Sequence, residues 1–119
     1  MRPQFRVNER DGWTVVAVAG ELDVYTAPRL REELVDLIGA GRRTLIVDLD
    51  GVTFVDSTGL GVLIGALKRL RGVGGDLRVV ATAEPVLRLM RVTGLNRVFG
   101  VFDSVDAATA SAGRQSQPV

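Results

Sequence analysis

The chain has 119 residues, 46% of them hydrophobic, and a formal net charge of +1 from 15 basic and 14 acidic side chains. This length fits one globular domain, and the charge balance provides no bulk field that would attract nucleic acid directly or bind an anionic lipid surface. Cysteine and histidine are both absent, which excludes disulfides, thiol nucleophiles, histidine-based triads and zinc sites built on those side chains.

The beginning of the chain predicts a β-hairpin. Residues 5–8 form a short strand candidate. The Arg10-Asp-Gly stretch is a turn signal, because Asp-Gly tolerates the positive φ of two-residue hairpin loops. The apolar run over 13–20 is typical of a strand that is covered on both faces.

A polar loop and a first helix follow. Thr26 is expected to cap this helix, with Pro28 in its first turn, where a missing N–H costs little. Gly39 and Gly41 are expected to end it. Its apolar face consists of Leu30, Leu34, Leu37 and Ile38.

The middle of the chain predicts a central strand, a polar junction and a second helix. The clearest strand is 44–49, and Val52, Phe54 and Val55 are expected to be buried in a strand or loop. Residues 56–58 are Asp, Ser and Thr, which are types that cap helix N-termini. After them an apolar helical face recurs at spacings of three and four: Leu60, Leu63, Ile64, Leu67 and Leu70.

The last third predicts two further strands and two helices. The glycines within 72–75 form a turn, since no Gly-Lys-Ser/Thr ending supports a phosphate loop. A strand at 77–81 and a short helix over 84–94 follow. The next elements are a strand at 97–102 with Phe99 and Phe102 in the core, and a final helical turn through Ala110 that Asp103 or Ser104 caps.

The order of elements, β-β-α-β-α-β-α-β-α, predicts an α/β domain. We expect a mixed central sheet of four to five strands with about four helices packed on it. The domain is expected to span residues 1–110, and the small polar residues of 111–119 to form a disordered tail.

The polar junction before the second helix carries more polar groups than capping requires. One cap suffices, with an effect of about 1 kcal/mol, so plain capping explains only one of Asp56, Ser57 and Thr58. Without a base or a Gly-x-Ser-x-Gly elbow, the hydroxyls are not expected to be hydrolytic nucleophiles. Glycine in a helix costs up to about 1 kcal/mol against alanine, so Gly59, Gly61 and Gly65 indicate either close packing on the sheet or a bare face for a partner. Gly61 and Gly65 lie off the apolar face, which favours the bare face.

Two other groups of polar residues have plainer interpretations. Glu21, Asp23 and Tyr25 lie in a loop after a buried strand. Two carboxylates at this spacing could hold a cation, but without a third ligand cluster surface recognition or solvation is favoured, and no metal or other cofactor is expected. Arg88 and Arg91 fit the solvated face of a short helix.

Three stretches together carry a family resemblance. They are Gly-Glu-Leu-Asp-Val-Tyr-Thr-Ala-Pro at 20–28, Phe-Val-Asp-Ser-Thr-Gly-Leu-Gly-Val-Leu at 54–63, and Val-Thr-Gly-Leu at 92–95. These stretches resemble the bacterial anti-sigma factor antagonists, which are single-domain proteins of the STAS class. The resemblance runs over roughly residues 5 to 110 and implies the fold expected above.

The resemblance implies a partner switch. The unphosphorylated protein would bind an anti-sigma factor that is also a serine kinase and so release the sigma factor; phosphorylation would break the complex, and a metal-dependent serine phosphatase would restore it. The phosphorylated position is Ser57, with Thr58 as a fallback acceptor. The partner-binding positions that the resemblance implies are Glu21, Asp23, Tyr25, Asp56, Ser57, Thr58, Gly59 and Gly61.

Two other functional classes remain as alternatives. One is a STAS subunit of a scaffold or of a lipid or anion transport system, in which any membrane-spanning part belongs to another chain. The other is an enzyme, which is not expected. No apolar run approaches the about 18 residues of a membrane span, and the start of the chain lacks the apolar stretch of a signal peptide, so a cytoplasmic protein is expected.

Overall fold

The structure is a computed structural model that describes residues 3–110, and it contains one five-stranded sheet. The strands are β1 (Gln4–Arg10), β2 (Trp13–Leu22), β3 (Thr44–Val55), β4 (Asp76–Val80) and β5 (Gly100–Phe102). The helices are α1 (Ala27–Gly39), α2 (Ser57–Arg71), α3 (Glu84–Thr93) and α4 (Val105–Ala110), with a 3₁₀ turn η1 (Leu95–Arg97). The predicted α/β class and element order are confirmed, while the expected tail at 111–119 lies outside the described residues.

The sheet is mixed because its first strand returns through a hairpin. The strands lie in the order β1-β2-β3-β4-β5; β1 is antiparallel to β2, and all later neighbours are parallel. Asp11 and Gly12 adopt φ values of 52° and 86° at the hairpin tip, as the turn signal predicts. The parallel strands therefore all end at the same edge of the sheet.

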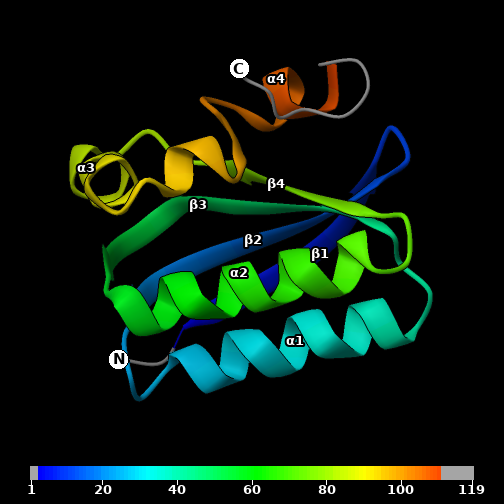
Figure 1. Cartoon of the computed structure of the whole chain (residues 1–119), viewed down its shortest axis with the longest axis horizontal. Helices are drawn as coiled ribbons and strands as arrows, with labels where there is room; N and C mark the ends of the chain where they lie inside the picture. The colour runs from blue at the N-terminus through cyan, green and yellow to red at the C-terminus, as the bar shows by residue number, and fades with distance from the viewer. Residues whose placement is uncertain (1–2, 111–119) are drawn as a thin grey trace.

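Helices cover both faces of the sheet (Figure 1). The larger core lies beneath α1 and α2, and side chains such as Val16, Val47 and Leu63 are fully buried in it. A smaller cluster on the opposite face packs Val15 and Ile46 against α4. Neighbouring residues of β2 thus enter different cores, which confirms a strand covered on both faces.

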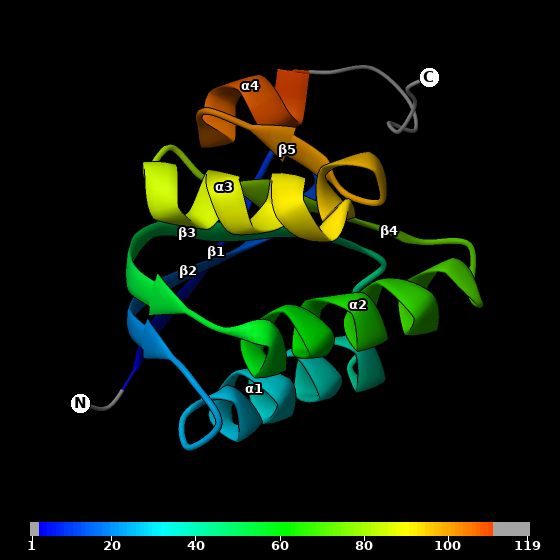
Figure 2. The same cartoon turned by 60° about the vertical axis from the view of Figure 1, so that its left-hand side comes forward.

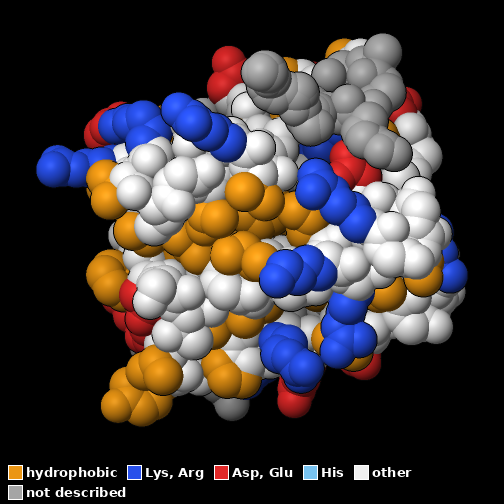
Figure 3. Space-filling model, viewed as in Figure 1, with side chains coloured by type: hydrophobic (Ala, Val, Ile, Leu, Met, Phe, Trp, Pro, Cys, Tyr) orange, Lys and Arg blue, Asp and Glu red, His pale blue; other side chains and the backbone are white. Residues whose placement is uncertain are grey.

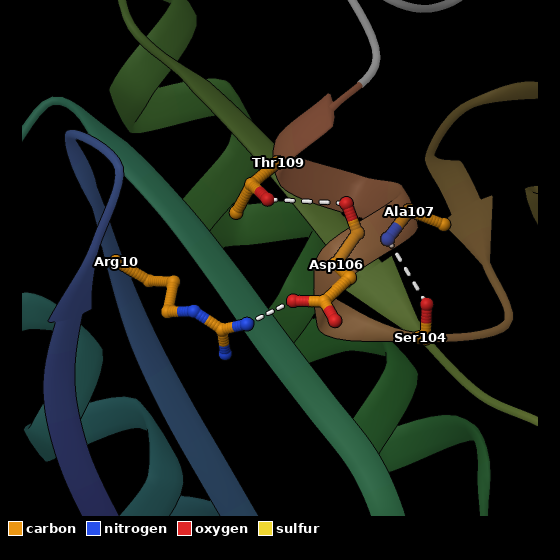
Figure 4. Close-up of polar contacts among 5 residues, drawn as sticks. All are labelled: Arg10, Ser104, Asp106, Ala107 and Thr109. Atoms are coloured by element: carbon orange, nitrogen blue, oxygen red, sulfur yellow. Dashed lines mark hydrogen bonds and ion pairs between the residues drawn. The ribbon is translucent and has the colours of Figure 1, made fainter.

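The short helix α4 is held by polar contacts around its first turn (Figure 4). The Ser104 hydroxyl accepts a hydrogen bond from the Ala107 amide at 3.0 Å, so Ser104 and not Asp103 is the cap. Asp106 pairs with Arg10 at the end of β1. Beneath α4 the Arg78 guanidinium lies over the rings of Trp13 and Phe102, at 4.3 and 5.5 Å from their centroids.

The structure corrects two expectations about local elements. The last strand covers only Gly100–Phe102, because Arg97 belongs to η1 and residues 98–99 form a turn and a bend. Phe54, expected to be buried, is 50% exposed, whereas Val52 and Val55 are buried as expected. The strand pairing explains this: Gly20 faces Val52 but Glu21 faces Phe54, so β3 carries one extra residue that changes which way Phe54 points.

Candidate functional site

The predicted site residues come together at the carboxyl end of β2 and β3. Leu22 pairs with Val55 in the parallel ladder, so the loop over 23–26 and the start of α2 leave the sheet side by side. The Asp56 amide donates to the Leu22 carbonyl at 3.1 Å and ties the two segments together. Figure 2 shows this loop and the first turn of α2 at the same end of the molecule.

Asp56 is the residue that caps α2. Its Oδ1 accepts hydrogen bonds from the amides of Thr58 and Gly59, at 2.9 and 3.2 Å. Ser57 is the first helical residue, its side chain is exposed, and within residues 3–110 no hydrogen bond engages its hydroxyl. Capping therefore explains Asp56 alone, and the Ser57 hydroxyl is accessible to another protein at a helix end that favours negative charge.

The preceding loop is folded by its own polar groups. Asp23 Oδ1 accepts from the amides of Tyr25 and Thr26 at 2.9 and 3.0 Å. The Thr26 hydroxyl accepts from the Asp23 amide at 2.9 Å and donates to the Glu21 carbonyl at 2.6 Å. Thr26 occupies the N-cap position of α1, as predicted, but its side chain makes no capping hydrogen bond. The result is a braced loop that holds the Tyr25 ring 86% exposed.

These hydrogen bonds shift the titration of Asp23. Desolvation is the largest single effect and acts to raise the pKa of Asp23, but the bonds from the Tyr25 and Thr26 amides and the Thr26 hydroxyl together hold the pKa below its ordinary value. A folded-state pKa below the unfolded one stabilises the fold above the unfolded value, near about 3.9, and this contribution is lost as pH falls through the folded value.

We therefore expect Asp23→Asn to lower the free energy of unfolding near neutral pH and to have less effect in acid. Asparagine keeps an oxygen acceptor but removes the charge, so the difference from wild type isolates the charge-assisted part of the bonds. Urea denaturation of both proteins between about pH 3 and pH 7 measures it. A difference that stays constant over this range would contradict the role given to the carboxylate.

The glycines of α2 serve two different purposes: one allows close packing on the sheet, and two leave a bare helix face. A Cβ on Gly59 would lie 3.0 Å from Val55 Cγ2 and 3.1 Å from Leu22 Cβ, so this glycine serves close packing on the sheet. A Cβ on Gly61 or Gly65 would meet nothing within 4 Å. Both of these line an open groove of about 300 Å³ between α1 and α2, whose lining also includes Thr58 and Arg69. The bare face thus exists, but only from Gly61 onward.

The sequence reasoning missed an apolar component of this end of the molecule. Val24 and Val92 are 55% and 75% exposed, and with Tyr25 and Phe54 they are four of the seven large hydrophobic residues exposed in the described chain. Tyr25 was predicted to contact a partner, but the exposure of the other three was missed, because Phe54 follows a bulge, Val24 lies in a loop and Val92 lies on the outer face of α3. Apolar side chains gathered beside a polar site are typical of protein–protein interaction surfaces.

Two classes of site are not found within the described residues. Between residues 3 and 110, no three acidic side chains converge as a metal site would require. No helix in that range combines the length and hydropathy needed to cross a bilayer.

Comparisons with known proteins agree on one family. A family model described as STAS domain matches residues 4–108. The chain is 43% identical over 94 residues to an anti-sigma-B factor antagonist of Bacillus subtilis, covering 79% of this chain and 84% of that protein. It is 35% identical over 106 residues to an anti-sigma-B factor antagonist of Staphylococcus aureus, covering 89% and 98%. The crystal structure of an anti-sigma factor antagonist from Mycobacterium paratuberculosis superposes with a TM-score of 0.83 at 32% identity, covering 89% of this chain and 90% of that one.

Proposed function

The chain belongs to the STAS domain family, and on this premise we propose that it is an anti-sigma factor antagonist switched by phosphorylation of Ser57. In the unphosphorylated form it binds an anti-sigma factor and releases the sigma factor. The anti-sigma factor is also the kinase that uses ATP to phosphorylate Ser57, and a serine phosphatase reverses the modification. The protein itself is a cytoplasmic binding module without catalysis.

The observation that carries this proposal is that Asp56 caps α2 while the neighbouring Ser57 hydroxyl is left exposed. Asp56 provides the cap, so the fold does not require the neighbouring hydroxyl. Ser57 is exposed at the first helical position, where a kinase can reach it. Two relatives that cover most of the chain are named anti-sigma-B factor antagonists, which supports an anti-sigma factor as the partner.

Electrostatics explains how one phosphate could end the complex without changing the fold. A phosphoserine carries about −1.5 to −2 charge at neutral pH. The helix end tolerates this charge, since backbone N–H groups point out of it. A partner surface that is matched to the neutral form would be repelled by this charge. Negative charge is already present at the same edge of the sheet, on Asp56, Asp23 and Glu21.

The direct test is phosphorylation by candidate anti-sigma kinases of the source organism. The purified protein is incubated with each kinase and ATP, and the modified residue is mapped by mass spectrometry. We expect one phosphate on Ser57, none on Ser57→Ala, and stable complexes only with the unmodified protein. Association with transporter subunits and no phosphorylation by any anti-sigma kinase would favour the scaffold or transport alternative and overturn this proposal.

Gly61→Ala should separate fold stability from partner binding. The added Cβ meets nothing within 4 Å, so the helix gains about 0.5–1 kcal/mol from the better helix former. If the anti-sigma factor packs closely on this face, the same methyl weakens its binding severalfold. Thermal denaturation and calorimetric titration of one protein preparation measure both effects, and Gly39→Ala, also open to solvent, is the control. Unchanged affinity would remove Gly61 from the binding surface.

A further inference from the structure

The exposed apolar residues beside Ser57 line a groove that the switch itself does not use. This groove has a volume of about 340 Å³ and lies between the end of β3 and α3. Phe54 and Val92 are 50% and 75% exposed at it, and the rest of its apolar lining is Val55, Pro85 and Leu89. Hydrophobic side chains form a band between α2 and α3 that reaches the left side of the view, where α2 begins (Figure 3). Side chains of this kind are not left open to water without a cost in solubility, so the groove indicates a docking surface.

One positive charge on the rim of the groove is unpaired within the described part of the chain. Arg88 lines the groove, and within residues 3–110 it makes no ion pair or hydrogen bond. Its neighbour Arg91 differs, because it is paired with Glu84 at 2.5 Å. The rim therefore presents one uncompensated positive charge beside an apolar floor, which matches an apolar anchor flanked by an acidic group.

The groove is within the reach of a partner that contacts Ser57. Phe54 precedes Ser57 by three residues, so their Cα atoms are at most about 11 Å apart. A standard interface buries about 800 Å² on each partner, which corresponds to a disc about 30 Å across. Such an interface centred on Ser57 is wide enough to include Phe54, which lines the groove together with Val92 of α3.

We propose that the groove is a second contact point for the anti-sigma factor, which inserts an apolar side chain between Phe54 and Val92 and places an acidic group against Arg88. This inference rests on the proposed function and adds to it the surface that supplies affinity independent of phosphorylation. Apolar anchors in pockets carry most of the energy of typical interfaces, whereas rim charges act on rate and specificity. The groove then supplies part of the affinity and orients the partner, and the phosphate on Ser57 weakens the same complex.

The test compares Val92→Asp with Val73→Asp, using the anti-sigma kinase found to phosphorylate Ser57. Both valines are exposed, 75% and 52%, and Val73 lies beyond the far end of α2, outside the lining of the groove, so it is the control. We expect Val92→Asp to weaken binding of the unphosphorylated protein at least tenfold and to raise the KM for Ser57 phosphorylation, with kcat within twofold of wild type. Val73→Asp should match wild type in binding affinity, KM and kcat. Thermal denaturation of both variants checks that each is folded.

Arg88 gives a second measurement that does not depend on the apolar residues. Arg88→Glu should weaken binding more than Arg88→Ala, because glutamate repels an acidic group whereas alanine only removes the attraction. The ratio between wild type and Arg88→Ala should shrink as salt is added. Equal affinities for Arg88→Ala and Arg88→Glu would remove the acidic group from the proposal.

The outcomes separate this inference from the proposed function. If wild type binds the kinase and Ser57→Asp does not, but Val92→Asp binds as well as Val73→Asp, the groove is not a contact and only this inference fails. If wild type and Ser57→Asp bind equally, the phosphorylation switch fails instead. A wild-type dimer that Val92→Asp converts to monomer, with unchanged kinase affinity, would assign the groove to a second copy of this chain and overturn the inference.

Discussion

Ser57→Asp is expected to weaken binding of the anti-sigma factor by a hundredfold or more while leaving the protein folded. A hundredfold loss corresponds to about 2.7 kcal/mol, which is within reach of one uncompensated charge at an interface matched to a neutral hydroxyl. Ser57 is exposed and its hydroxyl holds no other residue of the described chain, so little of this energy can come from a change in fold. Calorimetric titration of wild type and variant with the same anti-sigma factor measures the effect.

The stability of the same variant provides the control. A negative charge in the first turn of a helix stabilises it by about 0.3–1 kcal/mol, so the midpoint of thermal unfolding should stay constant or rise slightly. Ser57→Ala should bind as wild type does and stay bound in the presence of ATP, because it cannot accept the phosphate. If Ser57→Asp unfolds at a much lower temperature than wild type, its loss of binding is caused by a damaged fold and not by the negative charge at the interface.

Local chemistry made the cap at the start of α2 predictable from sequence. The cap of α2 depends on residues adjacent in the chain, and Asp56 bonds the amides two and three positions later. The hairpin tip and the αL glycine that ends α3, Gly94 at φ 78°, are local in the same sense. Thr26 shows the limit of this reasoning, because its hydroxyl accepts a hydrogen bond from the Asp23 amide in the loop and from no amide in the first turn of α1.

The flanks of the site were not predictable because they depend on contacts between distant segments. Phe54 is exposed as a consequence of the register between β2 and β3, which alternation within one strand does not encode. Arg88 and Val92 line a groove only because α3 packs beside the end of β3, and the sequence of α3 alone does not show this packing. Arg78 is 1% exposed and lies against Trp13, a pairing set by the neighbouring positions of β2, β3 and β4 in the sheet.

Gly59→Val should lower the free energy of unfolding by about 3 kcal/mol, the upper end of the usual cost of overpacking. Its Cβ would lie 3.0–3.2 Å from Val55 Cγ2, Leu22 Cβ and the Leu22 carbonyl oxygen, and the last of these is backbone that cannot turn aside. For a domain of this size the loss corresponds to a fall of about 10 °C or more in the midpoint of thermal unfolding.

Gly61→Val is the matched control for this prediction, because it makes the same substitution two residues along the same helix. Nothing lies within 4 Å of its Cβ, so the variant should remain within about 0.5 kcal/mol of wild type. Because both substitutions replace glycine by the same helix former, the difference between them isolates the contact with Leu22 and Val55. That contact seats the first turn of α2 against the loop after β2. Equal stability of the two variants would mean that the start of α2 is free to move away from the sheet.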